Sequence, residues 1–503
     1  MNALPKSEQV DVMLLLEGTF PYVSGGVSSW VNQIIRGFPD IRFGAVFIGS
    51  SREDYGAMKY ELPENLVHLE TYYLRDPRIK PQIMAHEGNR DAFRVVRQLH
   101  QWFLDPKPDT LNDEIKQLDF YLDPHKGVDY RQFLYARQSW DVIADLYDQR
   151  CTDPSFVDYF WTARNMHAPI WLLAEIASQL IPARVYHTVS TGYAGFLGAL
   201  LHYNTGRPLI LSEHGIYTKE RRIDVIQSEW IQDNRNALQK DPTEISYYRD
   251  LWIRFFETIG RFCYAAAGNI ISLYEGARER EIVDGALPER TMVIPNGIDI
   301  GRFAPLREQQ PDDPPPIVAL LGRVVPIKDI KTFIRSLRII ANHIPRVQGW
   351  IIGPEDEDPE YAEECKALVE SLAITENVKF MGFQNPMDIF PNAGVLVLSS
   401  VSEGLPLVIL EAFAAGLPVV ATDVGACRQL ITGLGPEDEA IGSAGGVVAI
   451  NNPLALADEL LKLLANSHEW KRARSSAISR VERFYAQEKM FASYREIYEK
   501  GMA

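Results

Sequence analysis

The sequence predicts an α/β protein made of two doubly wound domains, each a parallel sheet covered by helices, with a ligand cleft between the two domains. Short apolar runs typical of buried strands alternate with helical patterns in both halves of the chain. A glycine-containing loop connects the first strand to the first helix, and a turn signal followed by a proline-rich stretch separates the two halves. Ligands of such sheets bind at the carboxyl ends of the strands, so we expect the site there.

The composition excludes several functions. The 503 residues suffice for two or three domains, and the formal net charge of −16 argues against binding nucleic acid or an anionic membrane, because both require a basic surface. The four cysteines form no CxxC pair, which is typical of a reduced cytosol and argues against a zinc knuckle. We expect no signal peptide, and no run approaches the ~18 apolar residues of a membrane span. These observations predict a cytoplasmic protein without direct membrane insertion.

The first domain is predicted over residues 1–290. It opens with the strand Val12–Leu16, a loop from Gly18 to Gly26, and an amphipathic helix. Between about Tyr72 and His167 charged and aromatic residues dominate, and we interpret this segment as a helical elaboration of the domain. Further strands are expected at 43–48, 185–189, 209–212 and 270–273, and a helix around 93–103.

The second domain is predicted over residues 291–503. It opens with a segment that ends in the turn signal Pro295-Asn296-Gly297, and 311–316 reads as an exposed, stiff connector. The chain from about Leu454 onward is expected to be helical, with its terminal helices packing back on the first domain. Strands are expected at 317–321, 350–352, 378–381, 395–398 and 419–421, with helices at 330–344, at 361–372 and around Glu411.

Two glutamates eight residues apart, Glu403 and Glu411, are the most informative feature of the second domain. Pro406 suits the first turn of a helix and Gly416 suits its end, so Glu411 lies in mid-helix. Its neighbours on the helix are apolar, which predicts that its carboxylate is buried and needs a partner. Glu403 lies on a loop at the mouth of this helix. The pair could accept hydrogen bonds from the hydroxyls of one phosphate-bearing ligand; the alternative is a structural glutamate beside an unrelated loop glutamate.

Two loops carry candidate phosphate-binding residues. Arg323 and Lys328 follow the strand that ends at Leu321, where a guanidinium fork and an ammonium group could clamp a diphosphate. In the first domain, Gly25 and Gly26 precede a helix whose free N–H groups could face an anion. The alternatives are a solvated basic loop and a plain tight turn. No GxGxxG or Walker A motif is present.

His214 ends an apolar strand and is followed by Gly215, which places its ring at the carboxyl edge of the sheet. A single histidine is more often structural than catalytic, and His187, at the end of a similar strand, is a rival candidate. No HExxH spacing indicates a metal site, and no GxSxG motif indicates a nucleophile elbow.

Together these motifs resemble glycosyltransferase family 4, retaining enzymes with the GT-B fold of two Rossmann-like domains. The resemblance runs across most of the chain, and its most specific parts are the glutamate pair and the Pro-Asn-Gly-Ile-Asp turn. It rests on Gly25-Gly26, His214, 295–299 with Phe303, Gly322-Arg323, Lys328, Glu403 and Glu411.

The resemblance implies a role for each of these residues in the second domain. Arg323 and Lys328 would hold the diphosphate of a nucleotide-sugar donor. Glu403 would contact the hydroxyls of the donor sugar, and Glu411 would contact the ribose hydroxyls. The implied donor-binding set also includes Gly404 and Leu405.

In the first domain the resemblance implies that His214 lies beside the reacting sugar and that Gly25 and Gly26 approach the donor phosphate. The implied catalytic residues are His214, Arg323, Lys328 and Glu403. Retention normally calls for a carboxylate nucleophile, and the sequence identifies none. The resemblance implies attack on the face from which the diphosphate leaves, with the diphosphate taking the proton. No metal or other cofactor is expected, because Arg323 and Lys328 supply the stabilising charge.

The stretches 16–30 and 212–221 narrow the resemblance to the glycosyltransferases of bacterial Pel exopolysaccharide synthesis. This implies a UDP-hexose donor, UDP-glucose first, a growing polysaccharide acceptor, and membrane-embedded Pel synthesis and export subunits as partners that recruit the chain to the inner membrane. The chain departs from the family at His214-Gly215, where His-Asp or His-Thr is usual, and at Lys328-Asp329, where Lys-Gly is usual. Two alternatives stay open: a GT-B-like nucleotide-sugar epimerase and a nucleotide-sugar-binding scaffold without catalysis.

Overall fold

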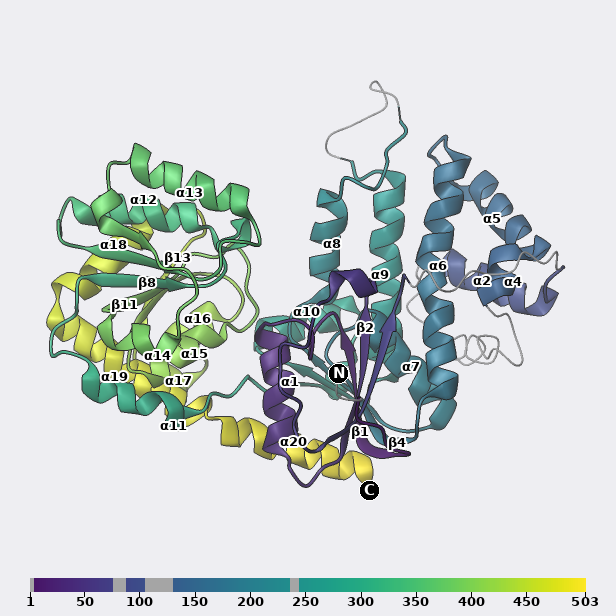
Figure 1. The fold of residues 1–503 in the computed structure, drawn as a ribbon, viewed down its shortest axis with the longest axis horizontal. Coiled ribbons are helices and arrows are strands. Elements are labelled where there is room, and N and C mark those ends of the chain that lie inside the picture. The colour runs from purple at the N-terminus through teal and green to yellow at the C-terminus, as the bar shows by residue number, and fades with distance from the viewer. Residues whose placement is uncertain (1–3, 76–86, 105–129, 236–243) are drawn as a thin grey trace. The chain divides into compact units, whose positions relative to one another are not determined.

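The computed structural model describes residues 4–75, 87–104, 130–235 and 244–503. The chain forms two compact α/β units (Figure 1). Unit 1 comprises residues 1–293 and 495–503, and unit 2 comprises residues 294–494. In the part of the chain that the structure describes, no helix is long and apolar enough to cross a membrane.

Unit 1 contains a seven-stranded sheet in the order β3-β2-β1-β4-β5-β6-β7, in which neighbouring strands pair in parallel. The order reverses between β1 and β4, so their loops leave the sheet in opposite directions and open a switch point. The strands are β1 (Val10–Glu17), β2 (Phe43–Gly49), β3 (Leu66–Tyr73), β4 (Ala183–Thr188), β5 (Leu209–Glu213), β6 (Asn269–Ser272) and β7 (Thr291–Val293).

Helices cover this sheet, and several of them gather in the segment between β3 and β4 (Figure 1). The helix α1 is amphipathic: Trp30, Val31, Ile34 and Ile35 are buried. The helices are α1 (Gly26–Gly37), α2 (Arg90–Leu104), α4 (Tyr130–Tyr135), α5 (Arg137–Arg150), α6 (Phe156–Gln179), α7 (Tyr193–Thr205), α8 (Tyr217–Gln227), α9 (Tyr247–Ala266) and α10 (Glu275–Asp284).

Unit 2 repeats the plan with a six-stranded parallel sheet in the order β10-β9-β8-β11-β12-β13. Its switch point lies between β8 and β11. The strands are β8 (Ile317–Leu321), β9 (Gln348–Ile352), β10 (Val378–Phe380), β11 (Val395–Leu398), β12 (Val419–Thr422) and β13 (Gly445–Val448). The two doubly wound sheets predicted from the alternation of strand and helix patterns are therefore confirmed.

The helices of unit 2 include two side-by-side pairs, α12 with α18 and α15 with α19. The last helix, α20, begins in unit 2, and its final residues belong to unit 1. The helices are α11 (Ile300–Phe303), α12 (Ile330–Ala341), α13 (Pro359–Ser371), α14 (Pro386–Ile389), α15 (Leu407–Ala414), α16 (Cys427–Thr432), α17 (Pro436–Glu439), α18 (Pro453–Ala465), α19 (Ser467–Phe484) and α20 (Gln487–Met502).

The structure departs from the sequence-based expectations in the segment after Tyr72 and at strand β13. The segment expected to be helical from about Tyr72 begins inside strand β3, and its described helices are α2, α4, α5 and α6; residues 76–86 and 105–129 of it lie outside the described residues. The glycine-initiated strand β13 was not expected, because Gly445 and Gly446 carry no strand preference. The stretch 311–316, expected as an exposed connector, begins with three exposed residues and lies within unit 2.

One buried ion pair holds the C-terminal part of unit 2 together. The side chain of Arg480, on α19, is fully buried, and its Nε lies 2.6 Å from Asp438 Oδ1. Its remaining N–H groups donate to the carbonyl oxygens of Ile431, Asp438 and Gly442. The guanidinium charge is thus surrounded by acceptors, which is the condition under which a buried ion pair is tolerated.

We expect Arg480→Leu to lower the free energy of unfolding of unit 2 by about 3–5 kcal/mol, because it leaves Asp438 buried without its partner. The matched control is Arg472→Leu on the same helix, where the exposed pair with Glu469 contributes at most about 1 kcal/mol. Urea unfolding followed by circular dichroism measures both. Equal effects of the two substitutions would contradict the assignment.

Candidate functional site

The carboxyl ends of β8 and β11 hold a lysine–glutamate pair at the switch point of unit 2. Lys328 follows β8 and Glu403 follows β11, and their Nζ and Oε1 atoms are 2.5 Å apart. The side chains are 19% and 13% exposed, so the pair is shielded but reachable. The structure therefore brings together two of the residues that the sequence singled out.

Backbone contacts fix the two loops to each other. The hydroxyl of Ser399 donates to the carbonyl oxygen of Lys328 at 2.9 Å, and the backbone N–H of Val401 donates to the carbonyl of Ile327 at 2.9 Å. The loop after β11 is held in turn by the N–H of Ala426, which donates to the carbonyl of Gly404. The lysine and the glutamate are thus positioned by main chain rather than by the ion pair alone.

The backbone of Asp329 shows why this chain can carry aspartate after Lys328, where the family that it resembles usually has glycine. It adopts a left-handed backbone conformation with φ 43°, which glycine adopts freely and aspartate tolerates. Its carboxylate accepts the backbone N–H of Thr332 and caps α12. The aspartate therefore serves the same turn as a glycine and adds a helix cap.

Gly425 is a residue that motif reasoning missed. Its φ is 54°, and a Cβ atom there would lie 2.3 Å from the carbonyl oxygens of Glu403 and Gly404. A side chain would therefore displace the loop that carries Glu403. The sequence signal was a glycine three residues after the strand β12, which is typical of a tight turn next to a site.

Glu411 lies on α15, as predicted, but its side chain is partly exposed rather than fully buried. Desolvation nevertheless raises the pKa of this carboxyl from 4.5 to about 7, against the opposing effect of Arg302. Among the described residues, no side chain is recorded in a hydrogen bond with Glu411. A half-buried carboxyl that is poised between its two protonation states is typical of a functional site.

Arg323 does not join the lysine–glutamate pair. Its guanidinium forms an ion pair with Glu357, and the two side chains are about half exposed. Exposed pairs of this kind contribute little free energy, so Arg323 can exchange Glu357 for an anionic ligand at small cost. Its predicted role as half of a diphosphate clamp remains a prediction.

The glycine loop of unit 1 leaves open space at the start of α1. Gly25 precedes this 12-residue helix and Gly26 is its first residue, and a Cβ atom built on either would meet nothing within 4 Å. The first turn carries no acidic residue, so its N–H groups are available to an anion. Neither glycine is required by close packing in this structure.

His214 follows β5, and its Nε2 atom is buried without a hydrogen-bond partner in the described structure. Its ring meets the ring of Trp30 edge-on at 4.4 Å, and burial lowers its pKa to about 3, so the imidazole is neutral at pH 7. His187, the rival candidate, is structural: its nitrogens contact the Tyr498 hydroxyl and Ser212 Oγ, each at 2.8 Å.

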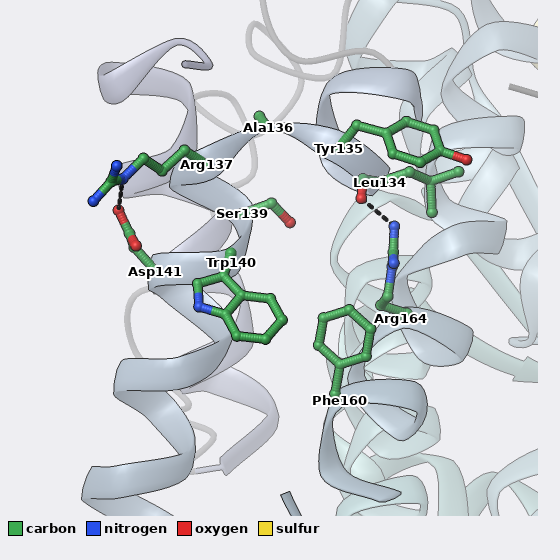
Figure 2. A pocket seen from close by; sticks show the side chains of 9 residues that line it. All are labelled: Leu134, Tyr135, Ala136, Arg137, Ser139, Trp140, Asp141, Phe160 and Arg164. Carbon is green, nitrogen blue, oxygen red and sulfur yellow. Dashed lines mark hydrogen bonds and ion pairs between the residues drawn. The ribbon is translucent and has the colours of Figure 1, made fainter. Parts of the chain in front are cut away.

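Two cavities of unit 1 are lined by described residues. The larger, of about 1330 Å³, includes His214 in its wall and lies at the carboxyl ends of β1, β4 and β5. The smaller, of about 540 Å³, lies among α4, α5 and α6, where Trp140 faces Phe160 (Figure 2). Two of its polar groups already have protein partners: Arg164 donates to the carbonyl of Leu134, and Ser139 Oγ donates to the carbonyl of Phe133. The smaller cavity therefore offers a ligand few unsatisfied groups.

The described residues contain no group of three or more histidine, cysteine, aspartate or glutamate side chains that could hold a metal ion. Two carboxyl groups of unit 1, those of Glu213 and Glu281, are buried. Glu213 accepts the hydroxyls of Thr191 and Tyr264, and burial raises its pKa to about 7. Burial likewise raises the pKa of Glu281 to about 8, and each carboxyl disfavours ionisation of the other.

Two doubly wound units in one chain define the GT-B class of fold, and solved structures agree. The Anabaena Alr3699/HepE structure in complex with UDP and glucose matches 97% of this chain and all of that chain, with a TM-score of 0.57 and 15% identity. Sucrose-phosphate synthase from Thermosynechococcus elongatus matches 97% of this chain and 98% of that chain, with a TM-score of 0.59 and 17% identity. At these identities the likeness shows the fold alone.

The chain belongs to the family described as "Domain of unknown function (DUF3492)", whose model matches residues 10–289. The model "Glycosyl transferases group 1" matches residues 304–480, which lie in unit 2. This second match covers β8, β11 and α15, and with them Lys328, Glu403 and Glu411.

Curated relatives match mainly over part of their length. A D-inositol 3-phosphate glycosyltransferase of Streptomyces bingchenggensis is 29% identical over 43% of this chain and 49% of its own. An alpha-maltose-1-phosphate synthase of Mycolicibacterium smegmatis is 27% identical over 49% of this chain and 60% of its own. The chain thus spans about half the length of the curated relatives that it matches.

The raised pKa of Glu411 predicts a pH dependence of stability. Between pH 4.5 and pH 7 the folded protein holds a proton on Glu411 that the unfolded chain releases, so the free energy of unfolding falls as pH rises through this window. In Glu411→Gln this contribution is absent. We expect the unfolding free energy of the wild-type protein to fall relative to that of the variant from pH 4.5 to 7, in urea titrations at half-unit steps.

The raised pKa values of Glu213 and Glu281 also lower the free energy of unfolding as pH rises. Both groups are present in the wild-type protein and in Glu411→Gln, so their contributions cancel in the difference between the two unfolding free energies. Parallel curves for the wild-type protein and Glu411→Gln would show that Glu411 ionises normally.

Proposed function

We propose that the protein is a retaining glycosyltransferase that moves a hexose from a UDP-sugar to a hydroxyl of a saccharide acceptor. The observation that carries this proposal is the Lys328–Glu403 pair at the switch point of unit 2, with Glu411 on the following helix α15, all inside the segment that matches the group 1 glycosyl transferases. Lys328 provides a cation for the phosphate, Glu403 a fixed carboxylate for the sugar, and Glu411 a carboxyl with a raised pKa for the ribose. UDP and UDP-glucose are the first ligands to test, because the Anabaena protein binds UDP and glucose on a similar fold.

The chemistry that we propose is electrostatic. As the bond between the sugar and the diphosphate breaks, negative charge grows on the diphosphate, and Lys328 stabilises it from a position set by the loop backbone. Arg323 adds a second positive charge after exchanging Glu357 for the ligand. Glu403, held by Lys328, accepts hydrogen bonds from sugar hydroxyls and fixes the orientation of the ring. The incoming hydroxyl attacks from the side of the leaving diphosphate, which accepts the proton, and the scheme includes no metal ion.

His214 is proposed to shape the site rather than to act as a base. Its low pKa is consistent with this role, because a ring that stays neutral can donate or accept a hydrogen bond without a change of charge. Its contact with the reacting sugar, and the predicted cleft between the domains, remain predictions.

The finer proposal is that the chain is a PelF-type enzyme of exopolysaccharide synthesis. It rests on the resemblance of residues 16–30 and 212–221. In this proposal the protein works in the cytoplasm, extends a growing polysaccharide, and is recruited to the inner membrane by membrane-embedded Pel synthesis and export subunits. Co-purification with those subunits tests this part separately from catalysis.

We expect UDP to bind with a dissociation constant at least about tenfold lower than those of GDP and ADP in calorimetry, and UDP-hexose to turn over when a saccharide acceptor is supplied. Lys328→Ala should lower turnover by about 10²–10³, because it removes a preorganised charge. The matched control is Lys331→Ala, three residues away, whose ammonium is paired with Glu364.

Three outcomes would contradict the proposal in different ways. Equal binding of the three nucleotides would reject the UDP assignment. Release of free sugar without an acceptor would favour the epimerase alternative, and binding without any turnover would favour the scaffold. Equal losses in Lys328→Ala and Lys331→Ala would reject the role of Lys328.

Substitutions of the two glutamates should have different effects on the affinities for UDP and UDP-glucose. Glu411→Gln should weaken UDP and UDP-glucose by the same factor, about 10-fold, because its proposed partner is the ribose common to both. Glu403→Gln should weaken UDP-glucose more than UDP, because its proposed partner is the hexose. Isothermal titration of each variant with both ligands measures this, and equal losses for UDP alone in the two variants would reject the division of roles.

A further inference from the structure

The larger cavity of unit 1 occupies the position that a doubly wound sheet offers a ligand. Its wall includes Glu17 and Gly18 after β1 and Ser190 after β4, the two strands between which the sheet order reverses. His214 contributes from the end of the next strand, β5. The volume of about 1330 Å³ exceeds that of ordinary small-molecule pockets and would hold several sugar rings.

Five residues in the wall of this cavity carry a buried polar atom that has no hydrogen-bond partner in the described structure. The atoms are Thr19 Oγ1, Ser190 Oγ, His214 Nε2, Arg221 Nε and Trp252 Nε1. Buried polar groups are nearly always paired, and an unpaired one costs about 1–3 kcal/mol. Their concentration around one cavity indicates that a ligand rich in hydroxyl groups completes them.

A proline on α6 exposes a further acceptor. Pro169 lies inside this helix and has no N–H, so the carbonyl oxygen of Asn165 lacks the donor that a helix normally supplies. Both residues line the cavity. A ligand hydroxyl can donate to this carbonyl, which adds an acceptor to a wall whose unpaired groups are mostly donors or hydroxyls.

Aromatic rings form another part of the wall. Trp252 stacks on Phe256 with ring centroids 5.8 Å apart, and Trp230 meets Trp252 edge-on at 5.6 Å. Sugar rings have apolar C–H faces and hydroxyl edges, so a wall that combines aromatic faces with unpaired polar atoms is suited to a saccharide.

The charge of the wall opposes an anionic ligand. Carboxylates outnumber guanidinium groups among the lining residues, and one guanidinium, that of Arg221, is already paired with Asp224 at 3.3 Å. A phosphate group placed here would meet more like charges than opposite ones. The carboxylates are those of Glu17, Glu53, Glu175, Glu220 and Asp224, against the guanidinium groups of Arg75 and Arg221.

We propose that this cavity is the acceptor site, that its ligand is an uncharged saccharide, and that it excludes phosphorylated sugars. This inference rests on the proposed function and specifies its acceptor. An uncharged acceptor would distinguish this chain from the curated relatives, whose names include the phosphorylated compound D-inositol 3-phosphate.

The test uses the full-length protein with maltose, cellobiose and lactose as neutral probes and maltose 1-phosphate as the anionic probe. Saturation-transfer NMR at saturating UDP measures binding. We expect at least one neutral disaccharide to bind and maltose 1-phosphate to bind at least about tenfold more weakly than maltose. Thr19→Val and Ser190→Ala should each weaken the neutral probe about 3–10-fold.

The matched control is Ser246→Ala, which removes another buried, unpartnered hydroxyl that is not in the wall of the cavity. It should leave the binding of the neutral probe unchanged. The double variant Glu53→Gln/Asp224→Asn should strengthen the binding of maltose 1-phosphate, because it removes two carboxylates from the wall.

UDP binding in the same samples separates the two proposals. If UDP binds but no neutral disaccharide does, or if maltose and maltose 1-phosphate bind equally, the cavity assignment is wrong and the donor proposal stands. If UDP does not bind, the proposed function itself fails. An equal loss of sugar binding in Ser246→Ala and Ser190→Ala would also overturn the cavity assignment.

Discussion

The reversal of strand order between β8 and β11 is the constraint on which the proposed chemistry depends. Because the two strands are neighbours but their connections leave in opposite directions, the loops that follow them separate and leave room at the sheet edge. Lys328 and Glu403 meet across this gap, and hydrogen bonds from the Ser399 hydroxyl and the Val401 backbone N–H to main-chain carbonyls hold the loops in register. Unit 1 repeats the reversal between β1 and β4, and its large cavity lies at the corresponding place.

Some buried polar groups of this protein have all their hydrogen-bond partners within the protein, and we interpret these groups as structural. Others lack such partners and are available to a ligand. Arg480 is fully buried, and acceptors from α16, α17 and the loop after α17 surround its guanidinium, so it stabilises unit 2 and is closed to ligands. His187 is similarly occupied by Tyr498 and Ser212. The side chains of Glu411 and His214, in contrast, form no hydrogen bond in the described structure. Burial raises the pKa of Glu411 and lowers the pKa of His214, so both side chains favour their neutral forms. Incomplete satisfaction of buried groups is expected where a bound ligand completes the network.

Much of the fold could be predicted from the sequence because its strands are continuous apolar runs and its helices have a clear apolar face. Strands Val10–Glu17 and Ile317–Leu321 are of this kind. Strand β13 could not be predicted, since it begins with two glycines and is defined by pairing with β12. The proximity of Lys328 and Glu403 could be predicted because both residues follow strands whose carboxyl ends lie at the same edge of the sheet. The pairing of Arg323 with Glu357 could not, because it depends on a contact between loops that are distant in the sequence. The unpaired atoms around the unit 1 cavity come from five separate segments and have no common sequence pattern.

The most direct test of the central claim is an experimental structure of the protein with UDP bound. The account predicts that the ribose hydroxyls lie within hydrogen-bond distance of Glu411 and that a diphosphate oxygen lies within about 3 Å of Lys328 Nζ. It also predicts that the Arg323 guanidinium has left Glu357. A structure in which UDP binds elsewhere in unit 2, with the Lys328–Glu403 pair and Glu411 untouched, would contradict the account.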